Sequence, residues 1–405
     1  MKLEVFEIRF DNPRGVYAAG EQVKGNVILR LRNPMKVRKV FLYFEGRAKC
    51  HWEVKHGRSK TDYRATETYI NETFDLFDAG TSGADHPAGE HSYPFCLLMG
   101  ASLPSSFEGR RGYVRYFCKA SINRPWKFDE HTKRAFTVIH PLDLNVVPTA
   151  GMPVWGEQDE SVEGCCCSVG NVQARLTLNK TGFVPGEPIT YTVDIFNKCD
   201  STIERVELDL KQLVTYTGYS NSIFSSGHPK HHTKVDNFSL LNHTNRIKRN
   251  TEEHIHRAVA VPPLPPSNLE GCGIIDISYF VELKVNVRWT SITIEREIII
   301  GTIPMHFAGV PQAPVIPVSL NSNASPSAPP LEPPPYSEPP PSYEESVFGR
   351  VEIRDENDDE HTSGQMGWAP SYPVYHYDAA TQHFQILPSL PVDTPSTAPP
   401  AYNQI

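Results

Sequence analysis

The chain contains 405 residues, with 39 lysines and arginines against 47 aspartates and glutamates, and its formal net charge is −8. Residues 310–405 hold 12 acidic and 2 basic residues, so the first 309 residues carry a net charge of about +2. A nearly neutral body argues against a nucleic-acid-binding protein, and the length is sufficient for two ordinary domains followed by a tail.

The first residues, M-K-L-E-V-F-E, alternate charged and apolar side chains and lack the apolar region of a signal peptide. The longest weakly polar run, residues 298–310, is shorter than the ~20 residues that a membrane-spanning helix needs. We therefore expect a cytoplasmic protein whose membrane association is peripheral only, and whose eight cysteines are reduced thiols.

Two segments of the body follow one pattern. Residues 17–31 read Y-A-A-G-E-Q-V-K-G-N-V-I-L-R-L, and residues 183–197 read F-V-P-G-E-P-I-T-Y-T-V-D-I-F-N. In both, a Gly-Glu turn precedes apolar residues at every second position, which is typical of a half-buried strand.

A second pair of segments repeats in the same order. L-P-S-S-F-E-G at 103–109 precedes V-R-Y-F, and L-P-P-S-N-L-E-G at 264–271 precedes I-S-Y-F. Matching landmarks at an offset of 161 to 166 residues indicate two homologous lobes. We assign residues 1–147 to the first lobe, 148–170 to a linker, 171–309 to the second lobe and 310–405 to a tail.

Both lobes are predicted to be all-β. Alternating or β-branched runs are separated by Gly, Pro and Asn turns, and no sustained apolar stripe of helical period is present, which favours immunoglobulin-like β-sandwiches. The clearest predicted strands are 39–44, 113–122, 190–196, 205–210 and 292–300.

Several polar clusters could be mistaken for catalytic or metal sites. We expect a solvated hairpin loop at 220–237 and a strand with solvent-facing imidazoles at 254–256 rather than metal ligands. No common catalytic motif is found, so neither an enzyme, nor a metal, nor a cofactor is predicted. The histidines concerned are His228, His231, His232, His254 and His256.

Two basic clusters and one cysteine run remain open to two readings. The basic residues are solvated surface or, if they share one face, a site for phosphorylated tails or anionic lipid. Cys165, Cys166 and Cys167 are too close together to bind one zinc ion, which leaves buried thiols or, alternatively, reversible palmitoylation. The basic clusters are Arg32, Lys36, Arg38 and Lys39, and Arg246, Lys248 and Arg249.

The tail is rich in proline and acidic residues, so we predict that residues 310–405 are disordered. It contains three P-P-x-Y strings, more than the roughly 0.2 expected from its composition. Proline pre-forms the polyproline II conformation that the aromatic groove of a WW domain binds. The predicted WW-binding residues are Pro333, Pro334 and Tyr336, Pro340, Pro341 and Tyr343, and Pro399, Pro400 and Tyr402.

A further tail motif overlaps this region. Pro326, Ser327, Ala328 and Pro329 match P-[ST]-A-P, the ligand of the UEV domain at the front of the ESCRT machinery. The string occurs once, against roughly 0.05 expected from the composition of the tail, and we treat it as a candidate ESCRT-binding site with a weaker signal than the three P-P-x-Y strings.

Together, the Gly-Glu repeat, L-P-S-S-F-E-G with V-R-Y, R-P-W at 124–126, the cysteine run and L-P-P-S-N-L-E-G-C resemble the α-arrestins, or arrestin domain-containing proteins. The resemblance covers residues 3–305, and the tail motifs are similar too. It implies two arrestin-like lobes in an adaptor that recruits WW-domain HECT-type ubiquitin ligases to membrane receptors or transporters.

That role would promote cargo ubiquitination, endocytosis and endosomal sorting, with recruitment of the protein from the cytoplasm to the plasma membrane and endosomes. The alternative is a structural sorting or signalling scaffold that uses an arrestin fold without ubiquitin.

Overall fold

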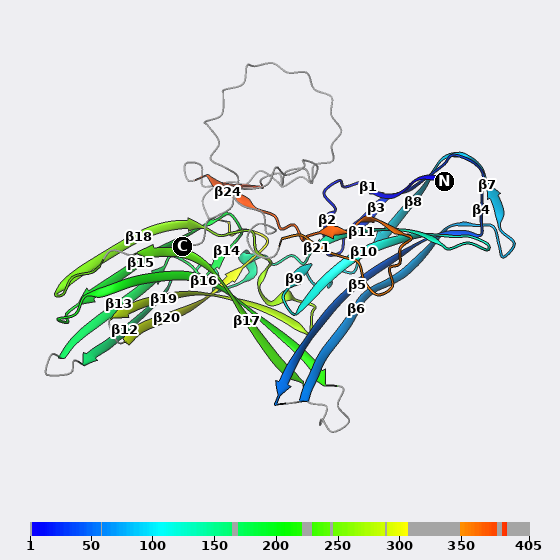
Figure 1. Cartoon of the computed structure of the whole chain (residues 1–405). Coiled ribbons are helices and arrows are strands. Elements are labelled where there is room, and N and C mark those ends of the chain that lie inside the picture. Colours follow the sequence, from blue (N-terminus) through cyan, green and yellow to red (C-terminus); the bar gives the residue numbers. More distant parts are fainter. Residues whose placement is uncertain are drawn as a thin grey trace, which may run out of the picture.

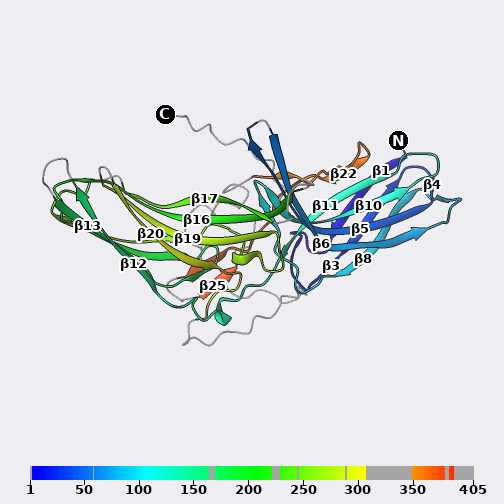
Figure 2. The same cartoon turned by 90° about the horizontal axis from the view of Figure 1, so that it is seen from below.

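The computed structural model describes residues 2–57, 59–163, 169–220, 229–243, 246–287, 290–306, 349–378 and 383–386. Within these ranges the chain forms β-strands and two short 3-10 turns, and no α-helix. The all-β prediction with two sandwich lobes is confirmed (Figures 1 and 2).

The first lobe packs a three-stranded sheet, β1-β3-β8, against the part of a larger sheet that contains β6, β5, β10, β11 and β2. Its strands are β1 (Leu3–Phe10), β2 (Val16–Ala18), β3 (Gln22–Leu31), β4 (Met35–Val37), β5 (Lys39–His56), β6 (Ser59–Asp78), β7 (Ala84–His86), β8 (Gly89–Leu98), β9 (Phe107–Gly109), β10 (Gly112–Asn123) and β11 (Glu130–Ile139).

The second lobe packs the sheet β12-β13-β15-β18 against β14-β20-β19-β16, with β17 beside β16. Its elements are η1 (Leu144–Val146), β12 (Val154–Glu163), β13 (Val169–Leu178), β14 (Gly182–Phe183), β15 (Pro188–Asn197), β16 (Ile203–Ser220), β17 (Lys230–His243), β18 (Thr251–Ala260), η2 (Ser267–Leu269), β19 (Ile275–Val287) and β20 (Thr290–Ile300).

The larger sheets of the two lobes join edge to edge. Tyr219 and Ser220 at the end of β16 pair with Arg64 and Tyr63 of β6, which makes one continuous sheet of 12 strands. The β5–β6 and β16–β17 hairpins therefore converge and project together from one side of the molecule (Figure 1). Trp52 lies at their junction, stacked between the rings of Tyr63 and His232.

Alternation along the strands places the core as the sequence predicts. On β15, Ile189, Tyr191, Val193 and Ile195 are buried, and the residues between them are partly exposed. One contiguous apolar cluster runs through both lobes. The five predicted strand runs lie within β5, β10, β15, β16 and β20.

The Gly-Glu repeat forms the same turn in both lobes. Gly20 and Gly186 have φ of 89° and 87°, a left-handed conformation that favours glycine. In each turn the glutamate carboxylate accepts a hydrogen bond from the backbone N–H three residues earlier. The donors are Ala18 for Glu21 (2.8 Å) and Val184 for Glu187 (3.1 Å).

The second repeated motif builds the junction between the lobes. The tyrosine after each motif donates a hydrogen bond to a proline carbonyl inside it, Tyr116 to Pro104 and Tyr279 to Pro265. The motif glycines face the opposite lobe. A Cβ on Gly109 would lie 2.3 Å from the Tyr216 hydroxyl, and a Cβ on Gly271 would lie 2.4 Å from the Ser102 carbonyl oxygen.

Two expectations about element boundaries differ from the structure. The predicted linker, 148–170, contains β12, which pairs with β13 along its whole length, so this strand is part of the second lobe. The predicted hairpin loop at 220–237 is shorter than expected, because β17 begins at Lys230 and extends β16. His231 and His232 are therefore strand residues, and backbone pairing with β16 outweighs their polar composition.

Residues 349–378, here called the strap, lie in the tail for which the sequence predicts disorder, yet they follow a defined path over both lobes (Figure 1, orange). The strap contains β21 (Val351–Glu352), β22 (Thr362–Gln365), β23 (Gly367–Trp368) and β24 (Tyr375–Asp378), and β24 pairs with β25 (His383–Ile386). Because β22 pairs in parallel with β11, the strap extends the sheet of the first lobe.

We predict that Gly364→Ala detaches β22. Gly364 has φ of 115°, and a Cβ there would lie 2.2 Å from the carbonyl oxygen of Lys133 on β11. Gly367→Ala, also in the strap, is the matched control because a Cβ at Gly367 has no heavy atom within 4 Å.

Hydrogen–deuterium exchange should show lost protection in β22 for Gly364→Ala alone, with the lobes unchanged in both variants. Equal protection of β22 in the two variants would contradict the observed docking.

Candidate functional site

The predicted partner-binding motifs lie outside the described residues. This holds for all three P-P-x-Y strings, for the P-S-A-P string at 326–329 and for the cysteine run at 165–167. Their roles therefore remain predictions. The structure instead describes the segment between the second and third P-P-x-Y strings, which is the strap.

His228 also lies outside the described residues, whereas the other predicted residues are placed directly. His254 and His256 are exposed on β18, as expected, where they contact Asp194 and Thr192 of β15. The two basic clusters do not share one face. Lys39 pairs with Asn123 at the end of the first lobe farthest from the junction, whereas Ile247 pairs with Ile203 at the far end of the second lobe.

The first anchor of the strap is ionic. Two aspartates of the acidic run enter a group of three cations on the outer side of β5, β10 and β11. The ion pairs are Lys133–Asp358 (2.7 Å), Lys119–Asp358 (2.8 Å), Lys133–Asp355 (3.0 Å) and Arg47–Asp355 (3.0 Å). The side chains of Lys133 and Asp358 are each only 1% exposed. These two aspartates of the acidic run therefore stabilise the docked strap and do not serve only as solubilising charge.

Electrostatics explain why the aspartates remain charged there. Burial raises the pKa of Asp358, but hydrogen bonds from Lys119 and Lys133 outweigh it, and the pKa lies below its usual range. Burial also raises the pKa of Asp355, but the hydrogen bond from Lys133 outweighs it, so this pKa is lowered as well. A buried charge is tolerated only when it is paired in this way.

An apolar contact supports the ionic anchor. Ile353, Met366 and Trp368 of the strap pack on Phe117 and Ala135, which point outward from the first lobe. The Lys133 ammonium lies 4.0 Å from the centre of the Phe117 ring, a favourable cation–π distance. Salt therefore screens only part of the docking energy.

The second anchor lies at the lobe junction. The Tyr372 hydroxyl donates to the carbonyl of Ser106 in the first lobe (2.9 Å), and the Tyr375 hydroxyl donates to that of Thr302 beyond β20. Burial raises the pKa of Tyr375 to about 12. The Tyr375 carbonyl oxygen passes so close to Gly186 that a Cβ there would lie 2.1 Å away. The strap thus bridges the two lobes.

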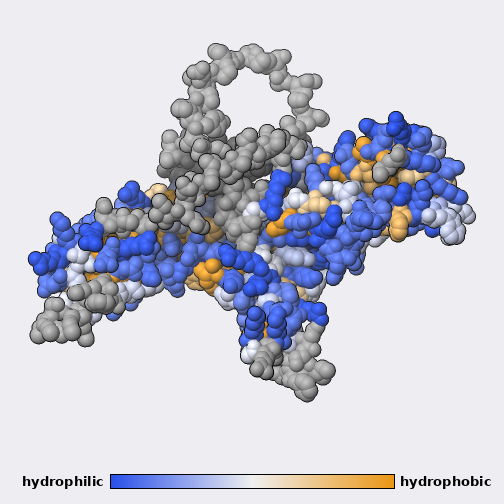
Figure 3. All heavy atoms as spheres, viewed as in Figure 1, coloured by the Kyte–Doolittle hydropathy of each residue, from blue (hydrophilic) through white to orange (hydrophobic). Residues whose placement is uncertain are grey.

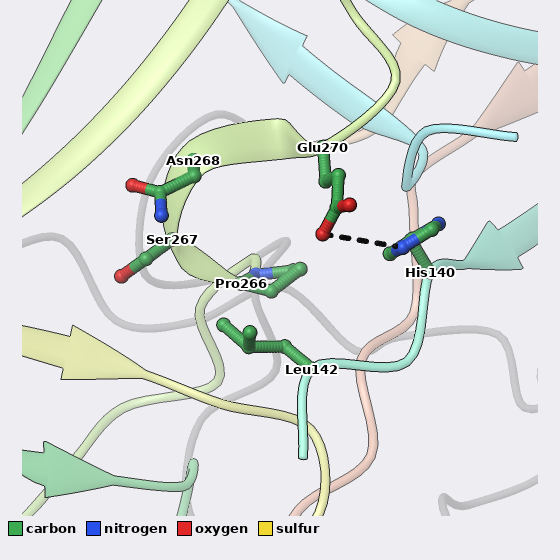
Figure 4. A pocket seen from close by; sticks show the side chains of 6 residues that line it. All are labelled: His140, Leu142, Pro266, Ser267, Asn268 and Glu270. Atoms are coloured by element: carbon green, nitrogen blue, oxygen red, sulfur yellow. Dashed lines mark ion pairs between the residues drawn. The ribbon is translucent and has the colours of Figure 1, made fainter. Parts of the chain in front are cut away.

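Two hollows border the η2 turn near the lobe junction. The larger one has a volume of about 290 Å³, and it is lined by Thr149, Thr181, Ser267, Asn268, Ser278, Glu297, Ile298 and Ile299. The smaller one, shown in Figure 4, has a volume of about 20 Å³, room for one water, and two of its lining residues, His140 and Glu270, form an ion pair (3.5 Å). Across the ranges that the structure describes, there is no group of three or more His, Cys, Asp or Glu side chains that could hold a metal ion.

The outer surface also bears on function. The face seen in Figure 3 is largely hydrophilic, with small apolar areas on both lobes. None of the helical turns in the described ranges is long and apolar enough to cross a bilayer.

We predict that Asp358→Asn weakens strap docking by about 3 kcal/mol, because it leaves Lys133 and Lys119 buried without their shared counter-charge. The protease-accessible population of the strap should rise by about 100-fold. Glu356→Gln removes the same charge from an exposed neighbour and should have little effect. Limited proteolysis at neutral pH measures both, and equal cleavage rates would refute the ionic anchor.

Strap docking should also depend on pH. The pKa values of Asp355 and Asp358 are lowered in the docked strap, so their stabilisation is present above the ordinary aspartate pKa of about 3.9 and is lost as the pH falls through the lowered values. Pepsin digestion in acid should therefore cut the strap increasingly below about pH 4.

Comparison with known proteins agrees with this architecture. Residues 6–145 match the family model of the arrestin (or S-antigen) N-terminal domain, and residues 168–305 match that of the arrestin (or S-antigen) C-terminal domain. The first match covers the first lobe, and the second covers the second lobe from β13 onward, with β12 before it.

Similar proteins carry the corresponding names. Arrestin domain-containing protein 17 of Caenorhabditis elegans is 33% identical over 314 residues, 75% of this chain and 72% of that protein. Arrestin domain-containing protein 1 of Homo sapiens is 28% identical over 336 residues, 82% of this chain and 72% of that protein. Arrestin domain-containing protein 4 of Mus musculus is 27% identical over 312 residues, 74% of this chain and 71% of that protein.

The lobes, their repeated turns and these matches agree: the chain belongs to the arrestin family, as one of its arrestin domain-containing members, the α-arrestins.

Proposed function

We propose that this protein is an adaptor that recruits WW-domain HECT-type ubiquitin ligases to membrane receptors or transporters. Arrestin-family proteins are adaptors rather than enzymes, which gives the broader role. The finer role rests on one observation, the three P-P-x-Y strings in a tail that follows two arrestin lobes. The proposed outcome is cargo ubiquitination, endocytosis and endosomal sorting, with recruitment from the cytoplasm to the plasma membrane and endosomes.

The strap supports the adaptor role because the predicted ligase motifs lie on either side of it in the sequence. Tyr343 precedes its first residue, Gly349, by six positions, and Tyr402 follows its last, Asp378, by 24. The predicted ligase motifs therefore leave from the two ends of a segment that is fixed to the lobes. A ligase bound at the second motif would stay close to the first lobe, because the six residues from Tyr343 to Gly349 span at most ~22 Å.

A scaffold without a ligase remains the competing role, and the motifs separate the two. A purely structural subunit has no need of three WW ligands. In both proposed roles the lobes would bind cargo, so only ligase binding discriminates the adaptor from the scaffold.

We predict that the triple variant Tyr336→Ala, Tyr343→Ala and Tyr402→Ala loses binding to isolated WW domains. Each substitution removes the aromatic anchor of one motif, which costs about 2 kcal/mol, about thirtyfold, at that motif. Pro317→Ala, a tail proline outside the motifs, should bind like the wild type. Calorimetry with the full-length chain measures this.

Undiminished WW binding by the triple variant would rule out the proposed ligase contact. Point substitutions are sharper here than a truncation after Val310, because that truncation also removes the strap.

We also propose that P-S-A-P at 326–329 binds a UEV-domain subunit of the ESCRT machinery, and that this excludes a WW domain from the first P-P-x-Y string. Polyproline II rises about 3.1 Å per residue, so Pro329 and Pro333 would be about 12 Å apart, too close for two domains. Simultaneous saturation of a peptide of residues 326–337 with both domains would contradict this exclusion.

A further inference from the structure

The turn between β10 and β11 carries two large aromatic side chains that the fold does not bury. Trp126 is 97% exposed and Phe128 is 73% exposed. Asn123, at the base of the turn, pairs with Lys39 at one end of β5, and the other half of β5 reaches the second lobe through the Cys50–Thr217 hydrogen bond. The turn is therefore at the outer edge of the first lobe.

Trp126 gains nothing from the rest of the fold that would explain its presence. Its φ is 61°, a left-handed conformation that is unfavourable for a bulky residue. Its side chain also remains almost wholly in water. A strained backbone and an unburied indole at the same position point to a contact outside the chain.

The charges within the turn itself are nearly balanced. Asp129 is held inward by Asn123 (3.0 Å) and by the backbone N–H of Arg124 (3.2 Å), and Glu130 pairs with Arg124 (2.7 Å). Lys127 is exposed between the two aromatic residues. On the strap side, the His361 ring stacks on Phe128 at 5.1 Å, and Glu360 beside it is 88% exposed. A contact at this turn therefore rests on the aromatic rings rather than on net charge.

We propose that this turn inserts into the interfacial region of a lipid bilayer. Tryptophan prefers that region because its apolar ring and its N–H are both satisfied there. The intervening lysine can bury its methylene chain and keep its ammonium at the phosphates. The arrangement is a narrow convex turn with aromatic residues at alternate positions, which suits a deformable surface.

The proposed function supplies the setting, because an adaptor for membrane cargo works beside a bilayer. The lipid contact itself is independent of the ligase motifs. Trp126 inserts most deeply, and Phe128 contributes less because His361 covers part of its ring.

The test uses the full-length chain and vesicles of phosphatidylcholine, with and without about 20% phosphatidylserine. Trp126→Ala should lower the partition coefficient by about tenfold and Phe128→Ala by about threefold. Trp155→Ala is the matched control, since Trp155 is another tryptophan that is 63% exposed but lies on β12 of the second lobe. Its binding should equal that of the wild type. Phosphatidylserine should change binding by less than about threefold, because the turn carries little net charge.

Brominated lipids give a second readout, since they should quench fluorescence in the wild type and in Trp155→Ala but much less in Trp126→Ala. Equal partition of the Trp126→Ala and Trp155→Ala variants would overturn the proposal. The proposal would also fail if a protein partner required Trp126 for binding and vesicle binding did not require it. WW-domain binding by Trp126→Ala should be unchanged, so failure here is distinguishable from failure of the proposed function.

Discussion

The whole arrangement depends on the fixed junction between the two lobes. Their larger sheets are joined through β6 and β16, and each lobe presses a motif glycine against the other. At Gly109 and Gly271 even a methyl group would collide with the opposite lobe. Because the junction has no room for side chains at these points, the two lobes are held in one relative orientation. The strap can therefore dock on both lobes as on a single surface.

The strap turns part of the tail into an element of the fold. Its ionic anchor on the first lobe and its tyrosine anchor at the junction differ in chemistry, so they respond differently to pH and salt. The ends of this segment fix the points from which the two flanking parts of the tail leave the body. In the adaptor role, this places ligase recruitment beside the lobes that would hold cargo.

Much of the fold could be predicted from the sequence because its signals are local. The Gly-Glu turns need a left-handed glycine, and alternating apolar residues such as Ile189, Tyr191 and Val193 mark a half-buried strand wherever they occur. The strap could not be predicted in this way. Asp358 is ordered by Lys133, which lies 225 positions away, and composition alone cannot report such a partner.

The aromatic residues Trp368, Tyr372 and Tyr375, unusual for a disordered tail, were the available signal. For β17, polar composition suggested a loop, but pairing with β16 decided the structure.

Proximity labelling in cells most directly tests the claim that one chain joins ligase to membrane cargo. The tag would be placed on the wild-type protein and on the variant with Tyr336, Tyr343 and Tyr402 changed to alanine. We expect the wild type to label WW-domain ligases and membrane proteins, and the variant to lose the ligases but retain the membrane proteins. Labelling of the same ligases by both forms would contradict the account.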